Sequence, residues 1–191
     1  RRAVVEPLQG RMANVEACFS VEGDISGYQS WGDALAALPA EPIVDQCEGA
    51  AMLYSSGTTG YPKGVKRPLP EHAYGESEDI NLAEVLYGCT EESIYLSPAP
   101  LYHAAPLAFT MGCLRHGTTV VMMQHFEAEY ALECIEKYQI THSQWVPTMF
   151  VRMLKLPEET RVKYDVSTMQ AAIHAAAPCP IPIKEKMIEW W

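Results

Sequence analysis

Eleven residues at positions 54–64, YSSGTTGYPKG, combine glycines, hydroxyl side chains and a single lysine. Glycine allows the backbone to turn several successive N–H groups toward one point, and such an arrangement binds anions, phosphate above all. Serine and threonine hydroxyls add donors, and a lysine adds a compact positive charge. The stretch therefore predicts a phosphate-binding loop built from Ser55, Ser56, Gly57, Thr58, Thr59, Gly60 and Lys63.

A flexible surface turn without a ligand is the alternative interpretation of this composition. The apolar residues before the loop and the lysine after it favour ligand binding. The spacing excludes a Walker-type loop, which requires G-x-x-x-x-G-K-[ST]. Here Gly57 and Gly60 lie too close together, and Gly64 rather than a hydroxyl residue follows Lys63.

The segment YSSGTTGYPKGV resembles the phosphate-binding signature of the adenylate-forming superfamily, which includes acyl-CoA synthetases, firefly-type luciferases and peptide-synthetase adenylation domains. Three later segments resemble further motifs of this superfamily in the same order: SPAPLYHAAPL (97–107), WVPTMF (145–150) and AAIHAAAPCP (171–180). The resemblance runs from about residue 49 to the end of the chain. It is closest to the fatty-acyl-CoA synthetases and related acid–CoA ligases, and it implies a role in fatty acid metabolism.

The resemblance implies an ATP-dependent ligase that uses ATP, Mg²⁺ and coenzyme A. A carboxylate oxygen of the substrate acid attacks the α-phosphorus of ATP, pyrophosphate leaves, and the thiol of coenzyme A then attacks the acyl-adenylate. The loop would hold the β- and γ-phosphates. His103 would face the acyl and thiol side of the site as the catalytic candidate. A structural histidine that caps a loop is the alternative for this residue.

Ala176, Ala177 and Pro178 match a small-residue turn that lies against the adenine in the superfamily, so they are candidates for nucleotide binding. Alanine replaces the usual glycine of this turn, and His174 stands where serine is common. Trp145 and Met149 could line an acyl pocket, although the same residue types at the end of a strand also pack as ordinary core.

The superfamily's later parts are an aromatic-Gly-x-Thr-Glu segment, an acidic residue for the ribose and a C-terminal lid with a catalytic lysine. The sequence contains none of these, and Lys184 and Lys186 belong to the terminal helix. We therefore expect residues 1–191 to be a fragment of the N-terminal AMP-binding (adenylation) domain, without the lid and inactive alone. An adenylation domain that loads a carrier protein, or a non-catalytic relative that binds a nucleotide or acyl ligand, stays open as an alternative.

Strand and helix signals alternate along the chain, which predicts an α/β fold with a largely parallel sheet flanked by helices, a partial acyl-CoA synthetase-like domain. A sheet of this kind would leave an exposed strand edge through which a homodimer could form. The expected strands are 14–21, 49–56, 93–100, 118–124, 140–146 and 169–176. The expected helices are 30–39, 80–88, 105–117, 129–139, one beginning at Pro147 and one following Pro182, and 66–79 is an expected surface loop.

Composition narrows the function further. A formal net charge of −10 argues against nucleic-acid binding. No G-x-G-x-x-G motif follows an expected strand, which argues against a dinucleotide-dependent oxidoreductase. No apolar stretch is long enough to predict a transmembrane helix. Six scattered cysteines indicate a reducing, cytoplasmic location. No metal site is expected, because the histidines outside these motifs show no metal-like clustering: His72, His116, His125 and His142.

Overall fold

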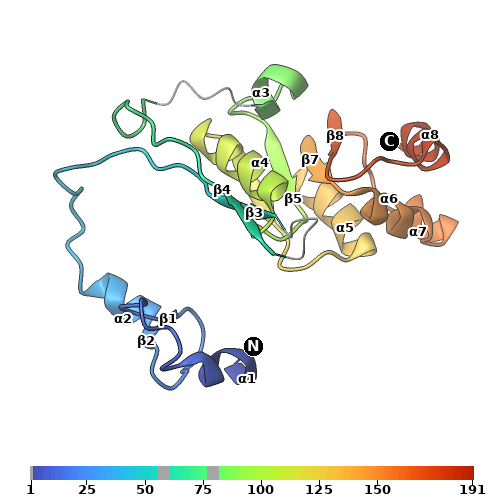
Figure 1. Cartoon of the computed structure of the whole chain (residues 1–191). Coiled ribbons are helices and arrows are strands. Elements are labelled where there is room, and N and C mark those ends of the chain that lie inside the picture. The colour runs from blue at the N-terminus through green and yellow to red at the C-terminus, as the bar shows by residue number, and fades with distance from the viewer. Residues whose placement is uncertain (1, 56–60, 77–81) are drawn as a thin grey trace. The chain divides into compact units, whose positions relative to one another are not determined.

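The computed structural model describes residues 2–55, 61–76 and 82–191 (Figure 1). Contacts between residues divide the chain into two units. The first unit comprises Arg1–Gly49 and Leu69–Glu76, and the second comprises Ala50–Pro68 and Ser77–Trp191. Among the described residues, no helix is long and apolar enough to cross a lipid bilayer.

The first unit contains short elements: α1 (Arg2–Val5), the 3₁₀ helix η1 (Glu6–Leu8), β1 (Phe19–Ser20), β2 (Gln29–Ser30) and α2 (Trp31–Ala36). Strands β1 and β2 pair in parallel. Only two residues of the strand expected at 14–21 form a strand, namely β1. The helix expected at 30–39 is confirmed as α2. Ser30 caps it, because its hydroxyl accepts a hydrogen bond from the Asp33 N–H at 3.3 Å.

The second unit begins with an antiparallel hairpin of β3 (Leu53–Ser55) and β4 (Lys63–Val65). The expectation of a buried strand at 49–56 is wrong, because Leu53 is 39% and Tyr54 69% exposed. A two-stranded ribbon pairs its backbone without covering either face, which explains why this apolar run stays accessible. Residues 66–76 form the expected surface loop, whereas 77–79 lie outside the described residues.

A four-stranded parallel sheet in the order β6-β5-β7-β8 forms the centre of the second unit, which confirms the predicted fold class. Its strands are β5 (Ile94–Ser97), β6 (Thr119–Met122), β7 (His142–Trp145) and β8 (Ala171–His174). The helices are α3 (Leu82–Tyr87), α4 (Ala104–Arg115), α5 (Ala128–Tyr138), α6 (Pro147–Leu154), α7 (Glu158–Arg161) and α8 (Ile181–Trp190). Among these described helices of the second unit, α7 alone was not expected from the sequence.

Local chemistry sets the ends of these helices. Gly117 terminates helix α4 two residues beyond its last residue, Arg115. Its φ of 77° lets the Thr118 N–H donate to the Cys113 carbonyl at 3.0 Å and the Gly117 N–H donate to the Leu114 carbonyl at 3.1 Å. Helix α6 begins at Pro147, whose fixed φ and missing N–H suit a first helical position. Both ends were predicted from the sequence.

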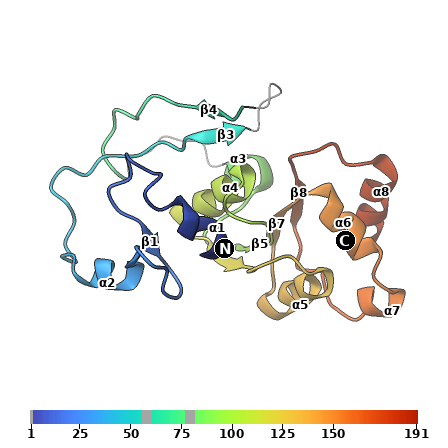
Figure 2. The same ribbon diagram turned by 60° about the horizontal axis from the view of Figure 1, so that its bottom comes forward.

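Two separate cores lie against the sheet. The larger one includes Leu96 and Trp145 from the strands and is covered by α5, α6 and α8. The smaller one joins Tyr95 to Ala83 of α3 and Cys113 of α4. Figure 2 shows α3 beside α4, apart from the group formed by α5, α6, α7 and α8. Neighbouring residues Tyr95 and Leu96 enter different cores because side chains alternate between the two faces of a strand.

Candidate functional site

The carboxyl ends of the parallel strands meet at one edge of the sheet. The chain leaves β5 for β6 on one side and leaves β7 for β8 on the other, so the direction of the connections reverses between β5 and β7. In open α/β sheets, ligands bind outside the carboxyl ends of the strands at such a reversal. The segments that follow β5, β7 and β8 are therefore the structural candidates for a binding site.

His103 lies in the segment that follows β5 and occupies the residue that precedes helix α4. Its carbonyl accepts a hydrogen bond from Leu107 N–H at 3.2 Å, but its side chain makes no capping bond. The imidazole is exposed, and its ring centre lies 4.5 Å from that of Tyr102. The side chain is thus not used to cap the loop and is available to a ligand.

The turn after β8 contains an unusual backbone conformation. Ala175 N–H donates to the Trp145 carbonyl at 3.1 Å and so extends the pairing of β7 with β8. The next residue, Ala176, has a φ of 73°, in the left-handed region that side chains other than glycine rarely adopt. Ala176, Ala177 and Pro178 are all exposed. This strained, accessible turn lies at the carboxyl edge, where such outliers concentrate around functional sites.

His174 immediately precedes this turn and is half-buried. Its ring packs edge-on against Phe150 of α6, with 6.4 Å between the ring centres. Its register partner on β7 is Trp145, so the two side chains lie on the same face of the sheet. A histidine is thus placed at the carboxyl edge of the sheet, directly before the exposed turn.

The predicted phosphate-binding loop connects the two strands of the β3–β4 hairpin. Ser55 pairs with Lys63, so the first and last residues of the predicted loop are opposite each other. Lys63 is exposed. Ser56, Gly57, Thr58, Thr59 and Gly60 lie outside the described residues, so their phosphate contacts stay a prediction. A loop followed by a strand differs from a Walker loop, which opens a helix.

Gly64 explains how the hairpin packs. It is the register partner of Tyr54, and a Cβ built on it would lie 3.1 Å from Tyr54 Cε1 and 2.6 Å from Met52 Cε. The two side chains therefore cover the glycine backbone. An aromatic ring over a cross-strand glycine is a known means of stabilising a strand pair.

Trp145 and Met149 belong to the larger core, with exposed fractions of 0% and 7%. The interpretation as core residues is confirmed for both. The indole Nε1 of Trp145 is buried and has no hydrogen-bond partner among the described atoms.

The remaining described histidines form no cluster that could bind a metal ion. Within the described residues, no group of three or more histidine, cysteine, aspartate or glutamate side chains could hold a metal ion. His142 is buried and hydrogen-bonded at both ring nitrogens, to the Tyr87 carbonyl at 2.9 Å and the Thr141 hydroxyl at 2.8 Å. His116 and His125 lie 3.6 and 3.4 Å from single glutamates. These histidines have satisfied or solvated positions, as expected from the sequence.

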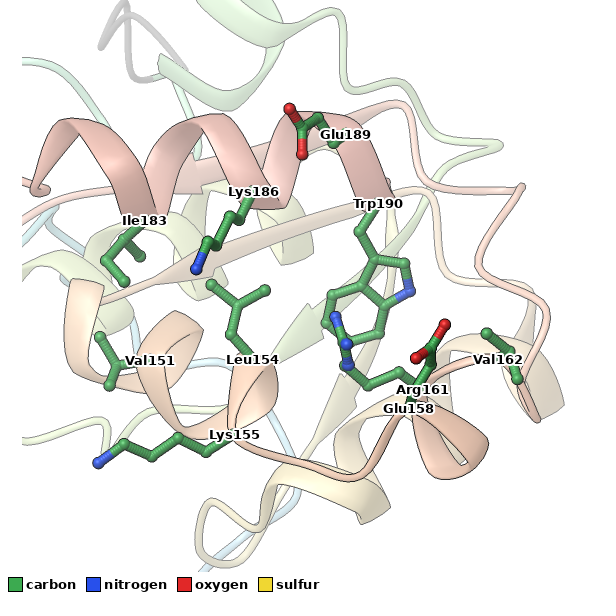
Figure 3. Close-up of a pocket in the computed structure, with 10 residues that line it drawn as sticks. All are labelled: Val151, Leu154, Lys155, Glu158, Arg161, Val162, Ile183, Lys186, Glu189 and Trp190. Atoms are coloured by element: carbon green, nitrogen blue, oxygen red, sulfur yellow. The ribbon is translucent and has the colours of Figure 1, made fainter.

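A groove of about 540 Å³ lies between α6, α7 and α8 (Figure 3). Trp190 and Lys186 extend from α8 toward the opposite wall, where the guanidinium of Arg161 lies 5.4 Å from the Trp190 ring centre. The walls of the groove come from these helices, and none of the residues predicted as site residues lines the groove. Sequence reasoning did not find this groove, because its residues carry no motif.

Comparison with known proteins places this fold and these motifs in a family. The AMP-binding enzyme family matches residues 5–191. The chain is 34% identical over 151 residues to a probable CoA ligase, CCL5, of Humulus lupulus, covering 76% of this chain and 26% of that protein. It is 32% identical over 147 residues to 4-coumarate-CoA ligase 1 of Narcissus pseudonarcissus, covering 73% and 25%.

The fold also matches solved structures. The N-terminal domain of FACL13 from Mycobacterium tuberculosis superposes with a TM-score of 0.70 at 21% identity, covering 98% of this chain and 46% of that chain. The chain spans about a quarter of the length of the curated relatives it matches. The match along nearly the whole chain shows that this protein belongs to the family of AMP-binding enzymes.

Proposed function

We propose that this chain is part of an ATP-dependent acid–CoA ligase that activates a carboxylic acid as its adenylate before transfer to coenzyme A. The observation that carries the proposal is the family match over residues 5–191, together with the glycine- and hydroxyl-rich sequence between β3 and β4. The two plant relatives are named as CoA ligases, which favours coenzyme A over a carrier protein as the acceptor. We also propose that residues 1–191 are a fragment of the AMP-binding domain and inactive alone.

The loop between β3 and β4 would act on the polyphosphate. As the substrate carboxylate attacks the α-phosphorus, negative charge moves onto the departing pyrophosphate. Loop N–H groups and the hydroxyls of Ser56, Thr58 and Thr59 would donate hydrogen bonds to these oxygens. Lys63, exposed at the start of β4, would add a positive charge. Catalysis of this kind depends on positioning and on stabilising developing charge, to which bound Mg²⁺ would contribute.

Residues at the sheet's carboxyl edge would hold the rest of the substrates. The turn at Ala176, Ala177 and Pro178 is exposed and would lie against the adenine. His103 has an exposed ring without a capping bond, so the ring could turn between the acyl side and the thiol side of the site.

The substrate class stays open among carboxylic acids. One relative is named for 4-coumarate, an aromatic acid, whereas the sequence resemblance points to fatty acids. For the location, we propose the cytoplasm, supported by the free state of all six cysteines. A homodimer through an outer strand of the sheet is a further proposal, because β6 and β8 each have one neighbour in the described sheet.

Pyrophosphate release by the full-length protein tests the function. We expect at least one acid in a panel of aromatic and aliphatic carboxylates to support release. Changing Lys63→Ala or Thr59→Ala should lower the rate by about 10²–10³-fold, because each removes a donor to developing charge. Lys66→Ala is the matched control, since this exposed lysine follows the hairpin and should leave the rate nearly unchanged.

Two outcomes would contradict the proposal in different ways. If no acid supports pyrophosphate release while ATP still binds, the ligase function is wrong. If release occurs but Lys63→Ala and Lys66→Ala have equal rates, the ligase function stands and the assignment of the loop is wrong.

A further inference from the structure

Two buried cysteines from distant parts of the sequence meet between α3, β5 and α4. The sulfur atoms of Cys89 and Cys113 are 3.9 Å apart, and both residues are fully buried. Cys89 lies just beyond the end of α3, and Cys113 lies in the last turn of α4. The sequence gives no indication of this pair, because the fold alone brings the two positions together.

Neighbouring hydroxyl groups determine where the thiol protons point. The Thr118 hydroxyl lies 3.7 Å from the Cys89 sulfur and donates its proton to the Thr90 carbonyl at 2.8 Å. It can therefore only accept a hydrogen bond from Cys89. With the Cys89 proton used in this way, the Cys113 thiol donates to the Cys89 sulfur. The pair is thus a chain of two hydrogen bonds that ends on Thr118.

The closed pair is protected from reaction. Burial, with Cys89 as a further cause, raises the pKa of the Cys113 thiol to about 12. Burial and the two thiols also raise the pKa of Tyr95, whose hydroxyl is buried without a hydrogen-bond partner among the described atoms. Because the thiolate is the reactive form, a protonated pair without solvent access reacts slowly.

Helix α3, which packs against this pair, is short and buries little of its surface. It spans six residues, of which only Ala83 is buried, while Leu82, Val85 and Leu86 are exposed. Short elements with little buried area open at low free energy. Cys89 follows a glycine with a φ of 69° in the turn after α3, so opening of the helix would expose this thiol first.

We propose that Cys89 and Cys113 form an oxidation-sensitive dithiol that hydrogen peroxide converts into an intramolecular disulfide. Cys89 loses its proton, and its thiolate attacks one peroxide oxygen, so that a sulfur–oxygen bond forms and the oxygen–oxygen bond breaks. The hydroxide that leaves takes up the proton from Cys89 and becomes water. The Cys113 thiolate then attacks the sulfenic sulfur, the sulfur–oxygen bond breaks, and the second hydroxide takes up the proton from Cys113 and leaves as water. In total, two thiols and one peroxide give one disulfide and two waters. This inference is independent of the proposed ligase function.

The distance between the sulfurs fits this reaction. A disulfide bond is about 2.05 Å long, so the sulfurs must approach by about 1.9 Å from their separation of 3.9 Å. Cys89 lies in the turn after α3, and its N–H donates to the Ala83 carbonyl at 3.1 Å, so its approach to Cys113 is coupled to opening of the end of α3. The product would tie the end of α3 to α4, the helix that begins directly after His103. Because such a link restricts the unfolded chain, the oxidised protein should melt at a higher temperature.

The test is native oxidation of the full-length protein with hydrogen peroxide, followed by denaturation, alkylation and peptide mapping without reductant. Cys89 and Cys113 should lose their free thiols together, with the Cys89–Cys113 peptide as the main intramolecular link. The exposed Cys47 serves as an internal control for oxidant dose. Recovery of Cys89 and Cys113 both alkylated, when Cys47 is fully oxidised, would overturn the proposal.

Serine variants show whether the disulfide depends on Cys89 and Cys113 rather than on any buried cysteine. Cys89→Ser and Cys113→Ser should each abolish the link, whereas Cys134→Ser should leave its yield unchanged. Cys134 is the matched control because it is only 1% exposed but has Tyr130 rather than a thiol as its hydrogen-bonding neighbour. If a serine variant fails to fold, peptide mapping of the unchanged protein still decides the result.

The opening step has its own measurement. Ala83→Gly should destabilise α3 by about 1 kcal/mol and therefore speed formation of the link by about five-fold. The oxidation rate of Cys47 should not change. An unchanged rate for the link would contradict opening through α3.

Discussion

Ala176 is the residue at which backbone geometry and proposed function meet most closely. It has a φ of 73° at the end of β8, although alanine has a Cβ atom that makes this conformation unfavourable. Gln139, the other described residue of this kind, ends helix α5, and its side chain bonds the Glu136 carbonyl at 2.7 Å. Ala176 ends no helix. Its conformation is therefore maintained by the turn itself.

We expect Ala176→Gly to stabilise the fold by about 0.5–1 kcal/mol. Glycine removes the unfavourable left-handed conformation, a gain of about 1–2 kcal/mol that is partly offset by greater freedom of the unfolded chain. Urea unfolding of the two proteins measures the difference.

Ala177→Gly is the matched control for this prediction, because Ala177 is also exposed and its φ is not positive. This change should destabilise the protein by about 0.5–1 kcal/mol, since only the entropic term remains. If both variants lose stability equally, Ala176 carries no strain.

At the scale of the element, the C-terminal end of helix α4 depends on a single glycine. The left-handed Gly117 ends α4 and directs the chain into β6. A Cβ added at this glycine would find only Glu91 Cβ, at an ordinary contact distance of 3.7 Å. The backbone angle, rather than a lack of space, is therefore what requires glycine here.

Gly117→Ala should lower the free energy of unfolding by about 1 kcal/mol, because alanine is strained at this φ. Gly49→Ala is the control, since Gly49 has an ordinary φ and no atom within 4 Å of its added Cβ. That control should stay within about 0.5 kcal/mol of the unchanged protein. Thermal unfolding monitored by circular dichroism compares the two, and equal losses would show that the helix end does not depend on glycine.

Elements with strong sequence signals were predicted, whereas elements formed by tertiary pairing were not. Gly117, Pro147 and the β-branched run of β6 indicated their elements directly. Strand β4 was missed because Lys63–Val65 has neither an apolar pattern nor sufficient length. Helix α7 was missed because its four residues, EETR, have no apolar periodicity.

In the candidate site, too, residues with a sequence motif were predicted, whereas features that depend on the folded structure were not. Motif residues such as His103 and the turn at Ala176 could be placed after the correct strands, because strand ends are marked by proline and small residues. The left-handed Ala176 was not foreseeable, since alanine does not signal a positive φ. The pairing of Cys89 with Cys113 was equally hidden, because proximity across 24 residues depends on the sheet order.

At the scale of the molecule, the buried apolar residues that the structure describes all lie in the second unit. All described hydrophobic residues of the core lie between Ala83 and Met187, whereas the first unit buries only the polar residues Ser20 and Glu48. Burial of apolar area is the main favourable contribution to folding. The first unit therefore has little intrinsic stability of its own.

Hydrogen exchange followed by mass spectrometry should resolve this difference. We expect backbone amides of β5 and β7 to exchange at least about 100-fold more slowly than those of residues 2–49, because the sheet opens only with the larger core. Equal protection across both regions would contradict the assignment of stability to the second unit.

The environment of Trp145 gives this molecule an optical property of its own. The indole is enclosed by Phe126, Phe150 and Trp191, at ring-centre distances of 6.3, 6.1 and 5.6 Å. Fixed, asymmetric aromatic neighbours of this kind produce intense near-ultraviolet dichroic bands and a blue-shifted emission. The rings belong to segments that precede β7, follow it and end the chain, so the contribution of Trp145 to the spectrum reports whether α6 and α8 have both closed over the sheet.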